Sequence, residues 1–552
     1  MEAPVRQIVK FAVASRLLIV LLQLASNVAL PDHDADVFNP PVNKTDFGHL
    51  DSIVHQMLGG FRRWDAIYFT HIMQYGYSYE NCIAFFPFFP WLASAAVNVL
   101  SSLQLLHVSS WILLISIVVN ITLFALTSLG LYKLGKDVLK DEYIAYYAAL
   151  FFCINPASIF MTAPYSETLY FFSLVYALNG LNANAKYAAS LLIGLGVFTR
   201  SNGLIGTGFV LHSIAKSFLA SCHYMYILYQ RSPIVLSKQK VLLIVTKAAL
   251  QTLVCSLLCV FPFFTFQYYT YLKFCLPESR TAGNLEPSII AYGRERGYHI
   301  QGDNPSSWCY DSIPLSYSYI QRQHWGVGFL QYYTWIQLPN FLLAFPIVCL
   351  SLRACYHFFN LDRKAALYLG LWDFRAVSLH RTLMRKKLDS VEYDEAGFRE
   401  PGNVNSNTEF FLSNRNPGGF EQPEVPQSLK QMPSVSDTVV FTIHLISLVT
   451  FGCLFVHIQV LTRLLCSSSP LIYWYCGTLF VSKCQRPILM QSSSGGLQGF
   501  AVAAMNKLHL HFIATLLSSW SCLSQELKCI VAYFILYFII GTVMFSNFLP
   551  WT

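Results

Sequence analysis

Residues 11–30 read FAVASRLLIVLLQLASNVAL, and this stretch decides the class of fold. It is mostly apolar and about 20 residues long, the length that an α-helix needs to cross a hydrocarbon core of about 30 Å. A cleavable signal peptide would have a shorter core and a small-residue cleavage site before a polar mature domain, whereas here Pro31 and several acids follow directly. We therefore expect a retained membrane-spanning helix.

The composition of the whole chain has the same character. Of 552 residues, 54% are hydrophobic and 15% aromatic, whereas only 12% are charged, about half of the roughly 25% usual in soluble domains. The mean hydropathy is +0.44. These values indicate a multi-pass membrane protein and exclude disordered, collagenous and small secreted scaffolds. The net charge of +8 comes without a nucleic-acid motif, so we expect no nucleic acid partner and assign the excess to helix orientation.

Further apolar runs predict an all-α, multi-pass transmembrane protein with roughly nine to twelve spans. The run 143–178 is too long for one span and contains Pro156 and Pro164, so we expect two segments that meet at a break. The run 186–220 is interrupted at 199–203. Lysines at 133–140 would prefer the cytoplasm, whereas simple alternation places them on the other side, so one intervening run is expected to be re-entrant.

Polar segments divide the chain into three predicted parts. Residues 1–357 form a membrane catalytic core with a first luminal loop at 31–81 and a second polar loop, also expected to be luminal, at 272–328; both loops are expected to carry short helices. Residues 358–437 begin with a basic stretch and continue into a run rich in Asn, Pro, Gly and Glu, which predicts a cytoplasmic, partly disordered insertion. Residues 438–552 are predicted to form C-terminal transmembrane helices.

Arg6 and Lys10 flank the first helix and orient it. By the positive-inside rule they lie in the cytoplasm, which places the loop 31–81 on the luminal side of a eukaryotic membrane. A glycosylation sequon at 43–45 agrees with that side, although a bare sequon is common by chance. Cys275 and Cys309 share one polar loop and could be bridged if that loop is luminal, but pairing cannot be deduced from sequence.

Asp32, Asp34 and Asp36 form an Asp-x-Asp-x-Asp motif after the first helix. Such acids can hold a divalent ion through oxygen ligands, but six or more ligands are normally needed and the calcium-loop glycine spacing is missing. We therefore expect a solvated luminal turn and assign no metal ligand.

Residues that carry chemistry are densest around Asp65. If 61–74 is helical, Asp65 shares one apolar, aromatic face with Phe61 and Tyr68. One interpretation is that Asp65 pairs with Arg62 or His71, or caps a short interfacial helix. The other makes Asp65 a general base at the lip of a membrane cavity, beside cations that offset phosphate charge. The candidates from this segment are Arg62, Arg63, Trp64, Asp65 and His71.

Two charged residues within the apolar runs are further candidates, because ionisable groups at that depth are costly. Glu167 follows the proline break, and Arg200 lies between two apolar segments. They either form an ion pair, or Arg200 binds the phosphate of a lipid carrier. His444, His457 and Arg463 are weaker candidates, since a lone His in an apolar run is more often a packing residue.

Several short motifs occur in order along nearly the whole chain. They are Arg63-Trp64-Asp65-Ala66, Gly76-Tyr77, Ala84-Phe85-Phe86-Pro87, Phe89-Pro90, Asn155-Pro156-Ala157-Ser158, Tyr165-Ser166-Glu167, Arg200-Ser201-Asn202-Gly203, Leu338-Pro339-Asn340-Phe341-Leu342-Leu343 and Asn547-Phe548-Leu549-Pro550-Trp551-Thr552. Together they resemble the GPI mannosyltransferase 2 family of the GT-C class. The 362–437 insertion and the 466–499 region depart from the family pattern, so nothing is carried over there.

This resemblance implies an enzyme of the endoplasmic-reticulum membrane with a luminal active site. It implies transfer of the second mannose, in α-1,6 linkage, from dolichyl phosphate mannose onto the mannosylated GPI precursor. It also implies an essential acid in the first luminal loop, where Asp65 lies. A β-linked donor and an α-linked product require inversion, hence one displacement with one carboxylate base. The residues expected to bind substrate are Arg62, Arg63, Trp64, His71, Tyr165, Glu167, Arg200 and Asn202.

The phosphate leaving group needs no separate acid, and nearby cations stabilise it. The mechanism requires no cofactor and does not exclude a divalent metal. The interpretation also leaves room for a small membrane partner subunit. A lipid or solute transporter is the alternative function, because broken helices and intramembrane charges suit alternating access. A transporter should place its functional acids at the bilayer midplane, however, and a non-catalytic scaffold leaves the isolated Asp65 unexplained.

Overall fold

The computed structural model describes residues 3–42, 47–231, 238–276, 285–371, 436–483 and 509–551. Within these ranges the chain is helical, and extended pairing is limited to one isolated bridge between Tyr79 and Ile300. This confirms the all-α, multi-pass class. Seven helices are long and apolar enough to cross a membrane: α1 (Ala3–Ala29), α5 (Val108–Leu139), α9 (Gly203–Arg231), α10 (Lys238–Phe274), α13 (Leu338–Leu361), α17 (Ser436–Phe455) and α22 (Gln525–Ser546).

Shorter helices explain why the described chain has fewer long spans than the apolar runs suggested. A bent pair, α18 and α19, raises the number to eight if it counts as one span. A helix such as α6, with 12 residues, is only about 18 Å long and covers little more than half of a bilayer core. The shorter helices of the bundle are α4 (Phe88–Ser101), α6 (Glu142–Cys153), α7 (Glu167–Asn182), α8 (Lys186–Thr199), α18 (Leu461–Cys466), α19 (Pro470–Lys483) and α21 (His511–Ser518).

Both interruptions predicted in the apolar runs are confirmed. The run 143–178 forms α6 and α7, separated by turns over residues 154–166 that we call the break segment. The run 186–220 forms α8 and α9, with a turn at 200–202. Proline at 156 and 164 cannot donate a backbone hydrogen bond, so a continuous helix through the break segment is disfavoured. Two pairs of helix ends therefore lie inside the bundle.

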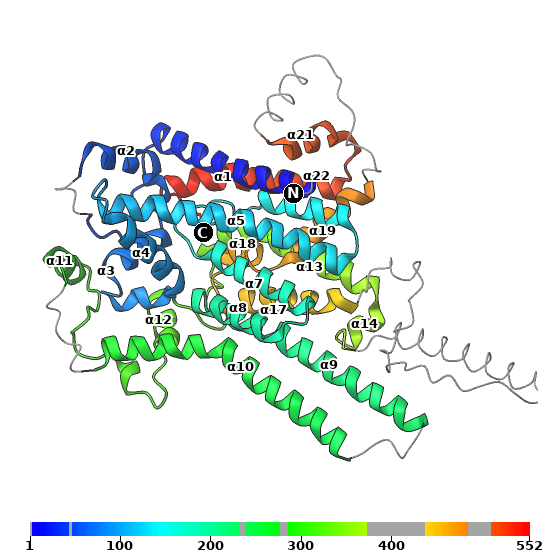
Figure 1. Ribbon diagram of the computed structural model, residues 1–552. Helices are drawn as coiled ribbons and strands as arrows, with labels where there is room; N and C mark the ends of the chain where they lie inside the picture. Colours follow the sequence, from blue (N-terminus) through cyan, green and yellow to red (C-terminus); the bar gives the residue numbers. More distant parts are fainter. Residues whose placement is uncertain are drawn as a thin grey trace, which may run out of the picture.

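One end of the bundle carries the polar loops with α2 (His49–Leu58), α3 (Asp65–Tyr75), α11 (Pro287–Glu295) and α12 (Ser316–Trp325), and we call it the loop end (Figure 1). Asp51 of α2 accepts a hydrogen bond from the backbone of His107 at 2.8 Å, so α5 begins there. At the opposite end, Tyr146 donates to Gln7 at 2.8 Å. Lys133–Lys140 therefore lie at the same end as Arg6.

The short helix α4 packs beside the loop helices. It follows α3 at the loop end, and the α5 that comes after it also begins at the loop end. Ser94 of α4 donates to the backbone carbonyl of Met73 in α3 at 3.0 Å. The chain thus enters and leaves α4 at the same end of the bundle; the re-entrant run stays a prediction.

The two polar loops pack against each other. The backbone of Glu80 donates to His299 at 2.9 Å, and the Trp308 indole donates to the Glu80 carboxylate at 2.6 Å. Cys275 and Cys309 form a disulfide, the bridged alternative of the sequence analysis. Of the predicted insertion, the described part contains only the end of α13, the short helix α14 (Arg363–Leu367) and the first residues of α17. Residues 372–435 and the sequon at 43–45 lie outside the described residues.

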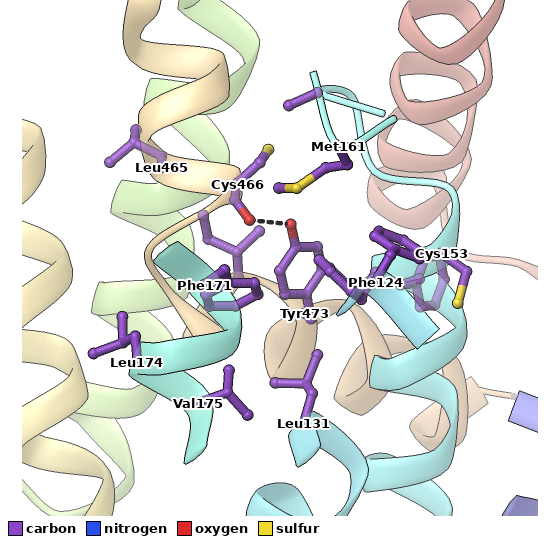
Figure 2. Packing of buried hydrophobic residues seen from close by; sticks show 14 of the residues in the cluster. Phe124, Leu131, Cys153, Met161, Phe171, Leu174, Val175, Leu465, Cys466 and Tyr473 are labelled. Carbon is purple, nitrogen blue, oxygen red and sulfur yellow. Dashed lines mark hydrogen bonds between the residues drawn. The ribbon is translucent and has the colours of Figure 1, made fainter. Parts of the chain in front are cut away.

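The core between the short helices is aromatic and fixes the bend between α18 and α19. Figure 2 shows Tyr473 of α19 beside Phe124 and Phe171, with its hydroxyl directed at the Cys466 carbonyl. That hydroxyl donates to the carbonyl at 2.6 Å, and α18 and α19 meet at 71°. Because Tyr473 and Cys466 are both fully buried, this bond fixes the direction of the six-residue helix α18.

Candidate active site

Asp65 begins a helix rather than lying within one. The helix expected over 61–74 begins only at Asp65, because Trp64 has φ +53° and ψ −129°, a conformation that a helix does not allow. Phe61 ends a separate short turn and does not share a helical face with Asp65. The backbone N–H of Asp65 donates to the Tyr165 hydroxyl at 3.1 Å. The acid thus sits at a helix N-terminus, where the helix dipole favours a carboxylate.

Four charged side chains form a connected network at this point. Asp65 Oδ2 lies 2.5 Å from Arg463 Nη1, and Glu167 Oε1 lies 2.5 Å from Arg200 Nη1. Arg463 Nη1 is also 3.9 Å from Glu167 Oε1, which joins the two pairs. Charges alternate along the series Asp65, Arg463, Glu167, Arg200, so the network is formally neutral. Two arginines close to two carboxylates can accommodate an additional anion without a large excess of negative charge.

Helix ends position the pair formed by Glu167 and Arg200. Glu167 is the first residue of α7 and Arg200 follows the last residue of α8, so each charge lies at the helix end whose dipole it complements. The Glu167 side chain is fully buried. Arg200 also donates to Ser166 and to Asn202, each at 3.3 Å. The ion pair that the sequence offered as one alternative for Glu167 and Arg200 is therefore present.

Arg463 is the centre of the network, although the sequence ranked it as a weak candidate. It lies in α18, and its guanidinium lies 5.6 Å from the ring of Phe160 and 5.7 Å from that of Tyr165. Such contacts favour a cation. Its partner Asp65 is 398 residues away in the chain, so no local pattern could join them. The available signal was a charged residue at the end of an apolar run.

The break segment is held in place from two sides. Asn120 of α5 donates to the carbonyls of Ala163 and Tyr165 at 2.6 and 3.1 Å. Arg16 of α1, which the sequence analysis did not single out, is fully buried and donates to the carbonyls of Cys153 and Ser158, both at 2.8 Å. Backbone groups freed by a broken helix must be satisfied inside a membrane. An arginine within an apolar span was the signal for this role.

A small pocket of about 80 Å³ opens beside the network. Trp64 and Thr462, the chain neighbours of Asp65 and Arg463, line it together with Phe160, Asn340, Gln459 and Trp551. The lining is mostly aromatic and aliphatic, with two amides and two hydroxyls, a combination that suits a sugar ring with its apolar faces and polar edges. The C-terminal residues thus contribute to the candidate site.

Arg62 and Arg63 lie outside the charge network. Arg63 pairs with Asp32 at 2.9 Å and donates to the carbonyls of Gly59 and Ser546 at 2.9 and 3.1 Å. The contact with Ser546 connects the first loop to the C-terminal end of α22. Arg62 donates to the Asn39 side chain at 3.3 Å and to the Pro40 carbonyl at 3.4 Å.

His71 is packed within the loop rather than beside Asp65. It is 3% exposed, stacks on Tyr79 with ring centres 5.1 Å apart, and its Nε2 lies 2.6 Å from Ser78 Oγ. Burial lowers the pKa of His71 to about 3, and the nearby Arg62 acts in the same direction. The ring is therefore neutral at physiological pH and does not supply a positive charge.

The acids of the first loop are used differently from the candidate base. Asp32 pairs with Arg63 and Asp36 pairs with Arg296. In the part of the chain that the structure describes, no three His, Cys, Asp or Glu side chains come close enough together to hold a metal ion. Asp34 is exposed. Asp32 and Asp36 therefore connect segments of the loop end, rather than only being solvated.

Comparison with known proteins identifies relatives over the full length. Residues 5–552 match the family described as mannosyltransferase (PIG-V). The chain is 35% identical over 551 residues to GPI alpha-1,6-mannosyltransferase 2 of Cricetulus griseus, covering 99% of this chain and 98% of the relative. It is 32% identical to the protein of the same name from Homo sapiens, again over 99% of this chain and 98% of the relative. GPI mannosyltransferase 2 of Drosophila melanogaster is 29% identical over 99% of both chains.

Among solved structures, the archaeal oligosaccharyltransferase AglB of Archaeoglobus fulgidus is similar at 12% identity, with a TM-score of 0.38. The similarity covers 97% of this chain and 56% of that one, so the chain spans little more than half of that protein's length. The family assignment depends on the sequence comparisons alone. The match over nearly all residues, together with relatives above 30% identity, shows that this chain is a member of the PIG-V mannosyltransferase family.

Proposed function

We propose that this enzyme adds a mannose in α-1,6 linkage to the mannosylated GPI precursor, with dolichyl phosphate mannose as donor and Asp65 as catalytic base. The relatives' names support the reaction. The observation that carries the assignment of the base is the position of Asp65, which lies at a helix N-terminus, 2.5 Å from an arginine and next to a pocket. We further propose that the loop end faces the lumen of the endoplasmic reticulum.

The residues support an inverting displacement. The Asp65 carboxylate takes the proton of the acceptor hydroxyl as its oxygen attacks the anomeric carbon, and the bond from that carbon to the phosphate oxygen breaks. The phosphate leaves with the electron pair and needs a cation rather than an acid. The pocket lined by Trp64 and Trp551 is the proposed place for the transferred sugar. The reaction needs no cofactor in this scheme.

The arrangement favours an enzyme over the transporter considered at the outset. The charged network is made from the ends of α3, α7 and α8 and from α18, and its Asp65, at the start of α3, belongs to the first loop. Both lipid-linked substrates could keep their tails in the bilayer while their head groups meet at the loop end. A transporter would be expected to hold its functional acids near the bilayer midplane, whereas Asp65 lies at the loop end.

The proposed function is tested with the purified full chain in lipid nanodiscs. Dolichyl phosphate mannose and a GPI precursor carrying one mannose are expected to yield a precursor with two, and NMR of the released glycan should show one new α-1,6 linkage. A product with another linkage would refute the assigned specificity. Failure to transfer mannose, despite rescue of GPI-anchored proteins in cells that lack the second mannosyltransferase, would refute the direct catalytic role.

A further inference from the structure

We infer that Arg463 is the binding site for the phosphate of the lipid-linked donor, and that this phosphate displaces the Asp65 carboxylate from Arg463. This inference rests on the proposed function, in which a polyprenyl phosphate sugar is the donor. It adds a binding residue and an order of substrate binding. Arg463 was not among the residues that the sequence assigned to substrate binding.

Arg463 is the arginine of the network with capacity for a new ligand. Arg200 is fixed by the fully buried Glu167 at 2.5 Å and by two further side-chain contacts. Arg463 makes one side-chain hydrogen bond among the described residues, to Asp65. Its Nε is buried and has no hydrogen-bond partner among those residues. Together with the nitrogen that Asp65 now occupies, this N–H gives Arg463 donors for a phosphate.

The two carboxylates near Arg463 differ in their freedom to move. The Glu167 side chain is fully buried, whereas that of Asp65 is 22% exposed. Asp65 therefore can leave Arg463 for a more solvated position, while Glu167 stays 3.9 Å away and keeps the guanidinium in place. Trp64 and Thr462, the chain neighbours of Asp65 and Arg463, line a pocket, whereas the two charged side chains do not line it.

The exchange frees an oxygen of Asp65. Asp65 Oδ2 lies 2.5 Å from Arg463 Nη1, so this oxygen is engaged by the guanidinium and not available to an acceptor hydroxyl. A phosphodiester bound at Arg463 takes over the contact. The released carboxylate can then turn toward the acceptor hydroxyl. Donor binding should therefore precede productive acceptor binding.

The step conserves charge within the site. With a singly charged phosphodiester bound, the two arginines, two carboxylates and phosphate sum to −1. The proton of the acceptor hydroxyl goes to Asp65, the new bond forms between its oxygen and the anomeric carbon, and the phosphate keeps the electrons of the broken bond. The phosphate then carries two negative charges and Asp65 none, so the sum remains −1. The attraction of Arg463 moves entirely to the leaving phosphate as the reaction proceeds.

The test measures binding of dolichyl phosphate to the full-length protein in nanodiscs, with uncharged dolichol and inorganic phosphate as separate probes. Asp65→Asn is expected to bind dolichyl phosphate about tenfold tighter than wild type, because Arg463 loses its competing carboxylate; Arg463→Gln should bind it at least tenfold more weakly. Asp34→Asn, an exposed acid of the same loop, is the matched control and should equal wild type. The affinity for uncharged dolichol should be the same in wild type and in both variants, and inorganic phosphate alone should bind weakly.

Equal or weaker binding by a folded Asp65→Asn would overturn the inference. A second measurement needs no variant: an acceptor analogue that lacks the reacting hydroxyl should inhibit wild type uncompetitively with respect to the donor. Competitive or noncompetitive inhibition would overturn the binding order. Either failure in a protein that transfers mannose refutes only this inference, whereas absence of mannose transfer by wild type would refute the proposed function.

Discussion

Replacing Arg16 by methionine is expected to destabilise the helix bundle by about 2 kcal/mol. Arg16 is fully buried in α1 and donates to the carbonyls of Cys153 and Ser158, both at 2.8 Å. Bonds from a charged donor contribute about 2–3 kcal/mol each, so the two together contribute about 5 kcal/mol. Methionine avoids the cost of a charge within the membrane, about 3 kcal/mol. The net loss is therefore about 2 kcal/mol.

The same arithmetic makes an unusual prediction for lysine. Arg16→Lys keeps the buried charge and has three N–H donors, but they radiate from one nitrogen and lack the spacing of the guanidinium's two nitrogens, so we expect one of the two carbonyl bonds to be lost. The free energy of unfolding of Arg16→Lys should therefore fall by about 2–3 kcal/mol, which is no less than the fall expected for Arg16→Met. Both variants should also lower mannosyl transfer, because the break segment carries the hydroxyl of Tyr165 that contacts Asp65.

The assay is reversible unfolding in mixed micelles by titration with sodium dodecyl sulfate, followed by circular dichroism. Arg6→Met is the matched control, because Arg6 lies in the same helix and is exposed, and its effect should stay within about 0.5 kcal/mol. If Arg16→Lys were as stable as wild type, or Arg16→Met as stable as Arg6→Met, the two carbonyl bonds would not support the break segment as argued.

Three further outcomes are expected from the same titration. The pKa of His71 falls to about 3 on burial, so the unfolded form gains a proton below about pH 6.5 while the folded form does not. Between pH 6.5 and 5, the free energy of unfolding of wild type should therefore fall by about 2 kcal/mol more than that of His71→Phe. Parallel pH curves would contradict this. Cys275→Ser should lower the free energy of unfolding by about 4 kcal/mol, because the disulfide closes a loop with a sequence separation of 34. Cys222 is free and exposed, so Cys222→Ser should leave the stability unchanged. Gly541→Val should lower the free energy of unfolding by about 1–3 kcal/mol, because a Cβ at Gly541 would lie 2.4 Å from the Trp551 ring. Adding Trp551→Ala should restore part of this loss. An unchanged stability of Gly541→Val would contradict this packing.

Features that depend on local chemistry were predictable from the sequence. Prolines in an apolar run predicted the break between α6 and α7. Among the described residues, fewer helices are long enough to span a membrane than the apolar runs suggested, because an apolar run does not reveal whether it forms a full or a half-length helix. The start of α3 was also missed: Trp64 has φ +53°, and no residue propensity signals such a conformation in a tryptophan.

The candidate site was only partly predictable for a related reason. Asp65, Glu167 and Arg200 stood out as isolated charges in apolar or aromatic surroundings, and the structure joins them. The residue that connects them, Arg463, belongs to a helix 398 residues from Asp65. Its importance comes from tertiary packing, which a single sequence does not show. Conversely, His71 and Arg63 looked like binding residues by proximity in sequence, but they pack within the loop end.

The central claim is that Asp65 is the catalytic base, and turnover of Asp65→Asn at saturating donor and acceptor tests it most directly. An asparagine keeps the size of the side chain but cannot accept the proton, so the rate of mannose transfer should fall by about 10²–10⁴-fold. The protein should remain folded and still bind dolichyl phosphate, and Asp34→Asn should keep the wild-type rate. A turnover of Asp65→Asn within tenfold of wild type would contradict the account.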